Sequence, residues 1–262
     1  MLKKRLIPVL LLQNGLLVRS ELFKIHQVIG NPINEAKRFN EWNVDELIYL
    51  DISQDGGYDL RRNDHKIREL TDPLGILDAV SKTCFMPLTW GGRIRSVEDM
   101  HVRFSLGADK ISINSEAIKK PKLINEGSQI YGSQAIVISI DALRHEDNKV
   151  EVFIDGGHTP TGMKPEDWAR QAEDLGAGEI LLQSIDRDGT GRGYDTELIR
   201  LVSSAVSIPV IACSGVGRYE HYTDGIKAGA SAVAAANIWH FKELSDRGGK
   251  RALKRGGIDV RF

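Results

Sequence analysis

The stretch PLTWGGRIRSVEDMHVRFSLGADKISIN (87–114) decides the fold, because the chain contains it in two similar copies. It consists of an apolar run behind a proline, a glycine-rich turn, a segment with helical periodicity and a second apolar run. The other copy, PVIACSGVGRYEHYTDGIKAGASAVAAA (209–236), follows the same order without a gap. A repeat of this length predicts a chain built from two similar halves.

Strand and helix patterns alternate along the rest of the chain as well. Eight short apolar runs are typical of parallel strands buried on both faces: RLIPVLLL (5–12), DELIYLDI (45–52), CFMPLTWGG (84–92), ADKISIN (108–114), QAIVISIDA (134–142), GEILLQSI (178–185), IPVIACSG (208–215) and SAVAAAN (231–237). Helical segments lie between them, among them NPINEAKRFNEWN (31–43), SVEDMHVRFSLG (96–107), KPEDWARQAEDLG (164–176), DTELIRLVSSA (195–205) and RYEHYTDGIKAG (218–229). The pattern predicts an α/β fold, a single TIM (β/α)8 barrel domain over residues 1–262, built from two similar half-barrels. An open doubly wound sheet is the alternative, but no GxGxxG turn follows the first strand.

Composition narrows the classes of partner and site. The net charge of −1 disfavours nucleic acid as a general partner, and no apolar run approaches the roughly 18 residues of a membrane span. Cys84 and Cys213 belong to no CxxC or Cys/His cluster, so neither a disulfide nor a zinc site is expected, and no other metal or cofactor is suggested. The N-terminal apolar run is too short for a signal peptide, so we expect a first strand and a cytoplasmic protein.

Acidic residues cluster where predicted strands end. Active sites of this fold lie at the C-terminal ends of the strands, where a pocket can raise the pKa of a carboxyl group. Asp51 follows the second strand, Asp141 the fifth and Asp188 the sixth, so all three are candidate general acids or bases. The structural alternative for Asp51 is that it braces the barrel rim.

Glycine-rich junctions predict two anion sites across the barrel mouth. CSGVG (213–217) and AAANIW (234–239) expose backbone N–H groups at helix starts, and WGGRIRS (90–96) with ISINS (111–115) occupies the matching positions of the other half. The segment from Gln13 to Pro32 reads as a long loop, and as a lid it could bring an arginine to a substrate phosphate. The candidate phosphate-binding residues are Arg19, Gly91, Gly92, Arg93, Asn114, Ser115, Gly189, Ser214, Gly215, Ala236 and Asn237. The alternative is that the glycines only permit tight turns.

Four charged residues lie at the starts of the first, second, fourth and sixth strands: Arg5, Glu46, Lys110 and Glu179. If all four point inward, they form an alternating ring of two cations and two anions. Charges inside a barrel are costly unless they are paired. An ordinary stabilising network is the alternative to a functional ring. Elsewhere, the charged run DLRRNDHKIRE (59–69) is typical of a solvated helix face.

Several of these motifs match a known family. VDELIYLDIS (44–53), GADKISINS (107–115), GSQAIVISIDA (132–142), GAGEILLQSIDRDGTGRGYD (176–195) and IPVIACSGVG (208–217) resemble HisF, the cyclase subunit of imidazole glycerol phosphate synthase. The similarity runs from residue 2 to about residue 242. It implies a TIM barrel with two phosphate sites, a HisH-like glutaminase docked on its N-terminal face, and ammonia that travels through the barrel. It also implies that the charged ring is the family's ammonia gate.

The same resemblance exposes a departure. The family's two catalytic aspartates end the first and fifth strands; the second is Asp141, but the first falls on Leu11. Leucine cannot transfer a proton, and loss of a general acid or base costs about 10²–10⁴ in rate. Further departures lie around the same mouth, at Arg19, Arg93, Gln183, Cys213, Ser214 and Asn237. The pattern indicates a paralogue that still receives ammonia but serves another phosphorylated acceptor.

The leucine run and VIGNPINEAKRFNE (28–41) are most similar to HisF-like proteins of surface-polysaccharide pathways. Those proteins act with a HisH-like glutaminase and an ATP-dependent synthetase to convert an N-acetyl group on a sugar into an acetamidine. The resemblance therefore implies a HisF-type synthase subunit for acetamidino-sugar synthesis. Two alternatives stay open: an authentic cyclase of histidine biosynthesis, and a non-catalytic ammonia conduit that activates the glutaminase.

Overall fold

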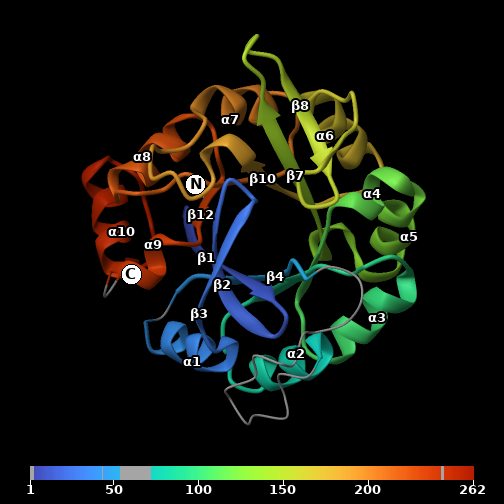
Figure 1. Cartoon of the computed structure of the whole chain (residues 1–262), viewed down its shortest axis with the longest axis horizontal. Coiled ribbons are helices and arrows are strands. Elements are labelled where there is room, and N and C mark those ends of the chain that lie inside the picture. Colours follow the sequence, from blue (N-terminus) through green and yellow to red (C-terminus); the bar gives the residue numbers. More distant parts are fainter. Residues whose placement is uncertain (1–2, 43, 54–71, 243–244) are drawn as a thin grey trace.

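The computed structural model describes residues 3–42, 44–53, 72–242 and 245–262, so the charged run at 59–69 lies outside the described residues. Eight parallel strands of the described chain close into a barrel (Figure 1). They are β1 (Arg5–Gln13), β4 (Leu47–Asp51), β5 (Leu88–Gly91), β6 (Lys110–Ile113), β7 (Ile136–Arg144), β10 (Glu179–Ser184), β11 (Val210–Cys213) and β12 (Ala232–Ala235). Pairing of β10 with β7 completes the ring, which confirms the TIM barrel and excludes the open sheet.

Helices surround the barrel on all sides in Figure 1. They are α1 (Pro32–Trp42), α2 (Pro73–Ser81), α3 (Val97–Ser105), α4 (Ser115–Lys119), α5 (Lys122–Tyr131), α6 (Pro165–Asp174), α7 (Thr196–Ser203), α8 (Glu220–Lys227), α9 (Ile238–Phe241) and α10 (Ser245–Arg255). The five helical segments named from the sequence are all present. None of the described helices is long and apolar enough to cross a membrane.

Alternate residues of most barrel strands belong to two separate cores. On β1, Ile7 and Val9 pack inside the barrel, whereas Leu6 and Leu10 pack against the helices. This division follows from the two-residue period of a strand, and it explains why the strand sequences are continuously apolar.

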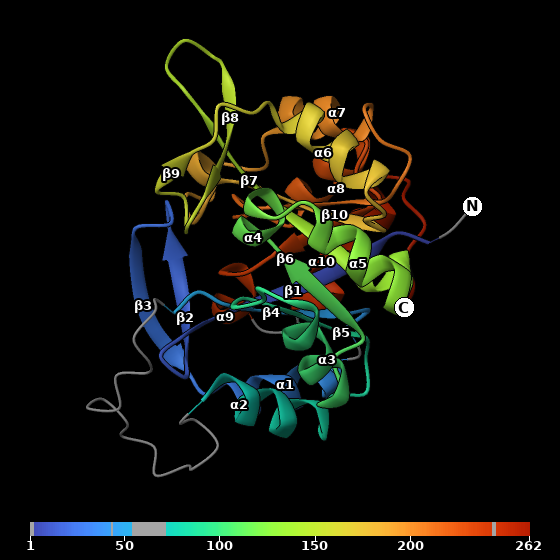
Figure 2. The same ribbon diagram turned by 90° about the vertical axis from the view of Figure 1, so that its right-hand side faces the viewer.

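The two halves repeat the same register, as the sequence repeat predicts. Leu11 of β1 pairs with Leu50 of β4, and Asp141 of β7 pairs with Gln183 of β10. Both β1 and β7 also continue into antiparallel strands: β2 (Leu16–Glu21) and β3 (Ile25–Gly30) follow β1, and β8 (Val150–Ile154) and β9 (Thr159–Pro160) follow β7. Figure 2 shows both extensions on one side of the barrel, with the two chain termini on the other.

The expectation of a long loop after Gln13 is wrong, because most of that segment forms the β2–β3 hairpin. Asn14 and Gly15 join β1 to β2 with φ of 51° and 79°, and Gln13 pairs with Leu16 across this two-residue turn. Asn-Gly is the preferred pair for such a turn because both positions require positive φ. The turn folds the chain back across the C-terminal end of the barrel.

Asp195 is predicted to stabilise the fold more than the other aspartate caps. It accepts from Leu198 N at the start of α7 and pairs in bidentate fashion with Arg144, at 2.7 to 3.0 Å. Asp195→Ala should therefore lower the free energy of unfolding by about 2–4 kcal/mol, because it uncaps α7 and leaves Arg144 with only the longer 3.6 Å pairing to exposed Glu197. Asp72→Ala, which removes only the cap of α2, should cost about 1 kcal/mol. Urea unfolding of both variants would measure this, and equal losses would contradict it.

Candidate functional site

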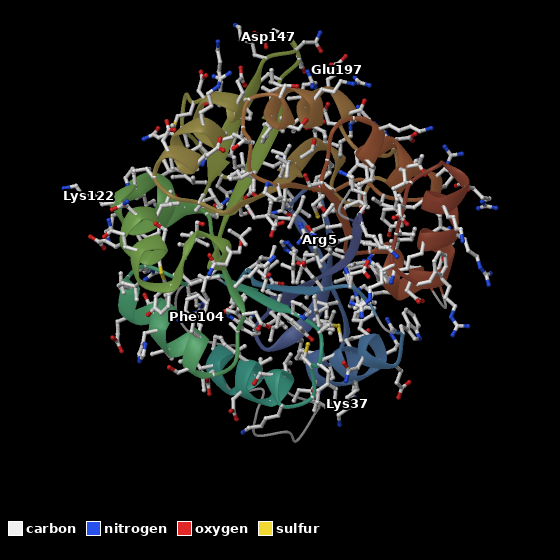
Figure 3. The ribbon with its side chains drawn as sticks, turned by 180° about the vertical axis from the view of Figure 1, so that it is seen from behind. Arg5, Lys37, Phe104, Lys122, Asp147 and Glu197 are labelled. Atoms are coloured by element: carbon white, nitrogen blue, oxygen red, sulfur yellow. The ribbon has the colours of Figure 1, made fainter. Side chains whose placement is uncertain are left out.

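The four predicted ring residues do meet at the N-terminal end of the barrel. Arg5 pairs with Glu46 at 2.5 Å and with Glu179, and Lys110 pairs with Glu179 at 2.9 Å and with Glu46 at 3.4 Å. Each carboxylate thus bridges both cations, and the contacts close into an alternating ring. Figure 3, which views the molecule from behind, places Arg5 at the centre of the circle of strands.

Pairing compensates for the burial of these charges. The side chains of Glu46 and Glu179 are 8% and 5% exposed. Burial alone would lower the pKa of Arg5, but the charges and hydrogen bonds of Glu179 and Glu46 outweigh it and raise that pKa. The ring is therefore a closure of the barrel end in which every charged group is paired.

The barrel interior beyond the ring is mainly apolar. Its inward-facing side chains form one cluster that includes Ile7, Val9, Ile48, Leu181 and Ile211. Such a wall offers no compensation for a desolvated ion. A small neutral molecule would meet no comparable cost there.

Asp141 faces the interior at the opposite, C-terminal end, which we call the mouth. It is 5% exposed, and it accepts hydrogen bonds from Gln183 at 2.9 Å and from Ser139 at 3.5 Å. Burial raises its pKa to about 7, although the two donors oppose the shift. A carboxyl group in this range can exchange a proton near neutral pH.

Leu11, at the matching position of the other half, offers no such chemistry. It is 9% exposed and packs in the interior cluster with Leu50, Cys213 and Val18, which comes from the hairpin strand β2. Burial raises the pKa of Cys213 to about 12, so that thiol remains protonated. This side of the mouth is apolar.

Asp188 anchors the β2–β3 hairpin. Its Oδ2 accepts from Ser20 Oγ at 2.6 Å and from Phe23 N at 3.3 Å, while its carbonyl accepts from Leu22 N at 3.0 Å. Burial raises the pKa of Asp188, and the bonds from Ser20 and Phe23 partly offset this. A Cβ on Gly189 would lie 2.4 Å from Ser20 O, so glycine is needed for the hairpin to approach.

Asn237, predicted to bind phosphate, holds the same hairpin. Its Nδ2 donates to Ser20 O at 2.8 Å, and its Oδ1 accepts from Ser20 N at 3.4 Å. Arg19 is engaged within the hairpin, where its Nε donates to Gln27 at 2.6 Å, and its guanidinium lies over the Phe241 ring. Ser20 therefore contacts the rim through both Asp188 and Asn237, a role that no sequence motif indicates.

Asp51 lies under the β5–α3 loop. It accepts from the backbone and hydroxyl of Ser53 at 3.0 and 2.6 Å, and its other oxygen lies 3.3 Å from Arg93 Nε. Burial raises its pKa, while Ser53 and the charges of Arg93 and Arg103 oppose the shift. These contacts match the structural alternative, in which Asp51 braces the rim.

The predicted anion loops adopt the tight turns that their glycines suggest. Gly92 has φ of 100°, and a Cβ there would lie 2.2 Å from Asp51 O; a Cβ on Gly91 would meet Leu50 at 2.6 Å. On the matching side, Ser214 and Gly215 have φ of 79° and 90°.

The polar side chains in these loops differ in whether they have hydrogen-bond partners. Ser115 Oγ donates to Asn114 and accepts from Asp155 N, so the β8–β9 side contacts the first loop. Ser214 Oγ is buried without a hydrogen-bond partner in the described part of the chain, and Ala236 packs on the interior cluster.

Residues 5–245 match the family model described as "Histidine biosynthesis protein". The chain belongs to this histidine biosynthesis protein family. Together with the closed barrel, the match makes it a HisF-like protein, of a kind that generally works as an enzyme with a glutaminase subunit. Within the described residues, no group of three or more His, Cys, Asp or Glu side chains is placed to hold a metal ion.

The ring predicts a large effect of removing one of its cations. In Arg5→Met the two buried carboxylates of this HisF-like barrel would share only Lys110, so the free energy of unfolding should fall by about 3–5 kcal/mol. Lys3→Met, which removes an exposed cation nearby, is the matched control. Denaturant titration followed by tryptophan fluorescence would measure both, and equal small losses would show that the ring does not act as a coupled unit.

Asp141 predicts a pH-dependent contribution to stability. Its folded-state pKa of about 7 exceeds the ordinary 3.8, so the folded chain holds a proton that the unfolded chain releases. The stability linked to this proton is fully present below the ordinary pKa and is lost as the pH rises through about 7. Asp141→Asn has no carboxyl group to titrate at this position. Its free energy of unfolding, relative to that of the wild type, should therefore rise by about 2 kcal/mol between pH 5 and pH 8. Exposed Asp174→Asn is the control, and a pH-independent difference for Asp141→Asn would refute the prediction.

Proposed function

We propose that this protein is a HisF-type synthase subunit that receives ammonia from a HisH-like glutaminase and delivers it to a phosphorylated acceptor at the mouth. The closed ring of Arg5, Glu46, Lys110 and Glu179 is the observation that carries the proposal. A paired ring at one end of an apolar interior suits a gate for a small neutral molecule. The glutaminase would dock on the N-terminal face, beside the ring.

The apolar half of the mouth supports an acceptor other than the bis-phosphate of histidine biosynthesis. Cyclisation of that substrate uses two aspartates, and Leu11 with Leu50 and Val18 leaves no proton-transfer group on the first strand. We therefore assign the protein to acetamidino-sugar synthesis for a surface polysaccharide, with an ATP-dependent synthetase as a further partner. The glycine-rich loops would hold the acceptor's phosphate groups.

Two retained features favour the authentic cyclase as the second candidate. Asp141 lies at the mouth with a pKa near neutrality, and both anion loops keep their tight turns. A third candidate, the non-catalytic conduit, differs from the proposed synthase only in what Asp141 does. Asp141→Asn separates these two, since a conduit or scaffold would keep its pathway output and a synthase would lose it.

The decisive measurement is turnover of the histidine-pathway bis-phosphate by the purified chain with excess ammonium salt, which bypasses the glutaminase. We expect no measurable turnover by the wild type, at least about 10²-fold below a true cyclase, because Leu11 cannot transfer a proton. Leu11→Asp, and Leu11→Asn as the matched polar control that cannot act as a base, are assayed alongside.

Each outcome assigns the protein differently. Robust wild-type turnover would make it an authentic cyclase and overturn the proposed acceptor. A gain confined to Leu11→Asp would mean that one residue separates the pocket from the cyclases. Inactivity of all three proteins, with ammonia transfer to an N-acetylated sugar phosphate when glutaminase and synthetase are added, would support the proposal in full.

A further inference from the structure

The mouth is chemically divided between the two half-barrels. Leu11 is in register with Leu50, and at the matching positions of the other half Asp141 is in register with Gln183. Paired residues on neighbouring strands point to the same face of a sheet, so both pairs line the interior. One half of the mouth therefore carries two leucines, and the other carries a carboxyl and an amide.

The strongest hydrogen bonds to Asp141 come from Gln183 and Ser139 of its own half, and Asn114 of the other half adds a weaker one. Gln183 Nε2 donates to Asp141 Oδ1 at 2.9 Å and lies 3.3 Å from Ser139 Oγ, which approaches the same carboxyl oxygen at 3.5 Å. Asn114 Nδ2 donates to the Ser139 carbonyl at 3.0 Å and so fixes the neighbouring strand. The shortest of these contacts to the carboxyl is the one from Gln183.

The hydrogen bond from Gln183 matters for the position and pKa of Asp141 because Asp141 is buried. A buried carboxyl depends on its hydrogen-bond donors, because loss of one donor leaves a polar oxygen unsatisfied away from water. After burial itself, the Gln183 bond has the strongest influence on the pKa of Asp141, and it acts to lower it. The titratable groups nearby are Asp188, whose charge raises that pKa, and Cys213, which burial keeps protonated.

We infer that Gln183 is a positioning residue for Asp141: its amide fixes one carboxyl oxygen at the mouth of a barrel whose first strand carries Leu11 instead of a polar partner. This inference rests on the proposed function only for the task of Asp141, which is to exchange a proton as ammonia reacts there. The hydrogen bond from Gln183 to Asp141 lies within this chain and does not depend on a partner or a substrate.

The test is a carboxyl titration of Asp141 by ¹³C NMR, in protein labelled at the aspartate carboxyl carbon. Asp141→Asn identifies the signal. Gln183→Met keeps the length of the side chain but removes its donor, so the titration midpoint should rise from about 7 by roughly one pH unit. Ser139→Ala removes the longer contact and should shift it less.

Two further variants make the outcome decisive. Gln183→Asn keeps an amide but is one methylene too short, so it should behave like Gln183→Met even if the thioether packs poorly. Gln171→Met, on an exposed face of α6, should leave the midpoint unchanged. An unshifted midpoint in a folded Gln183 variant would overturn the inference. The titration needs neither glutaminase nor acceptor, so its result is independent of whether the proposed function is correct.

Discussion

Closure of the sheet is the constraint on which the other features depend. Because β10 pairs with both β11 and β7, each barrel strand is held by two neighbours, and a slip of one residue would exchange its inner and outer faces. On β1 this fixes Arg5, Ile7, Val9 and Leu11 in one line along the interior. The charged ring and the mouth are therefore two ends of the same rows of side chains, and neither can be repositioned without the other.

Much of this arrangement could be predicted because it follows from periodicity and repetition. The eight strands, the helices between them and the four ring residues follow from continuous apolar runs and from the position of charges at strand starts. The β2–β3 hairpin replaces the expected loop; Asn14–Gly15 is a strong turn signal, whereas the length of the segment alone does not distinguish a loop from a hairpin. The anchoring of that hairpin through Ser20, Asp188 and Asn237 could not be predicted, since it joins residues more than 160 positions apart.

The two ends of the barrel differ in whether their buried ionisable groups are paired with opposite charges. At the ring each charged side chain contacts two of opposite sign, so pairing offsets the cost of desolvation. At the mouth Asp141 accepts from amide and hydroxyl donors, and in the described part of the chain no cation donates to it, so burial brings its pKa to about 7. The first end therefore holds mutually paired charges, and the second holds one group whose pKa lies near neutral pH.

This contrast bears on what could pass between the two ends. Ammonium would lose its hydration in the apolar interior, whereas neutral ammonia would not meet a comparable penalty. The ring carries two cations and two anions, so it has no net charge with which to attract or retain ammonium. On the proposed function, passage would then require the displacement of a side chain of the ring. Lys110 makes the longest of the four contacts, 3.4 Å to Glu46, and a flexible lysine is displaced at less cost than an arginine that links both carboxylates.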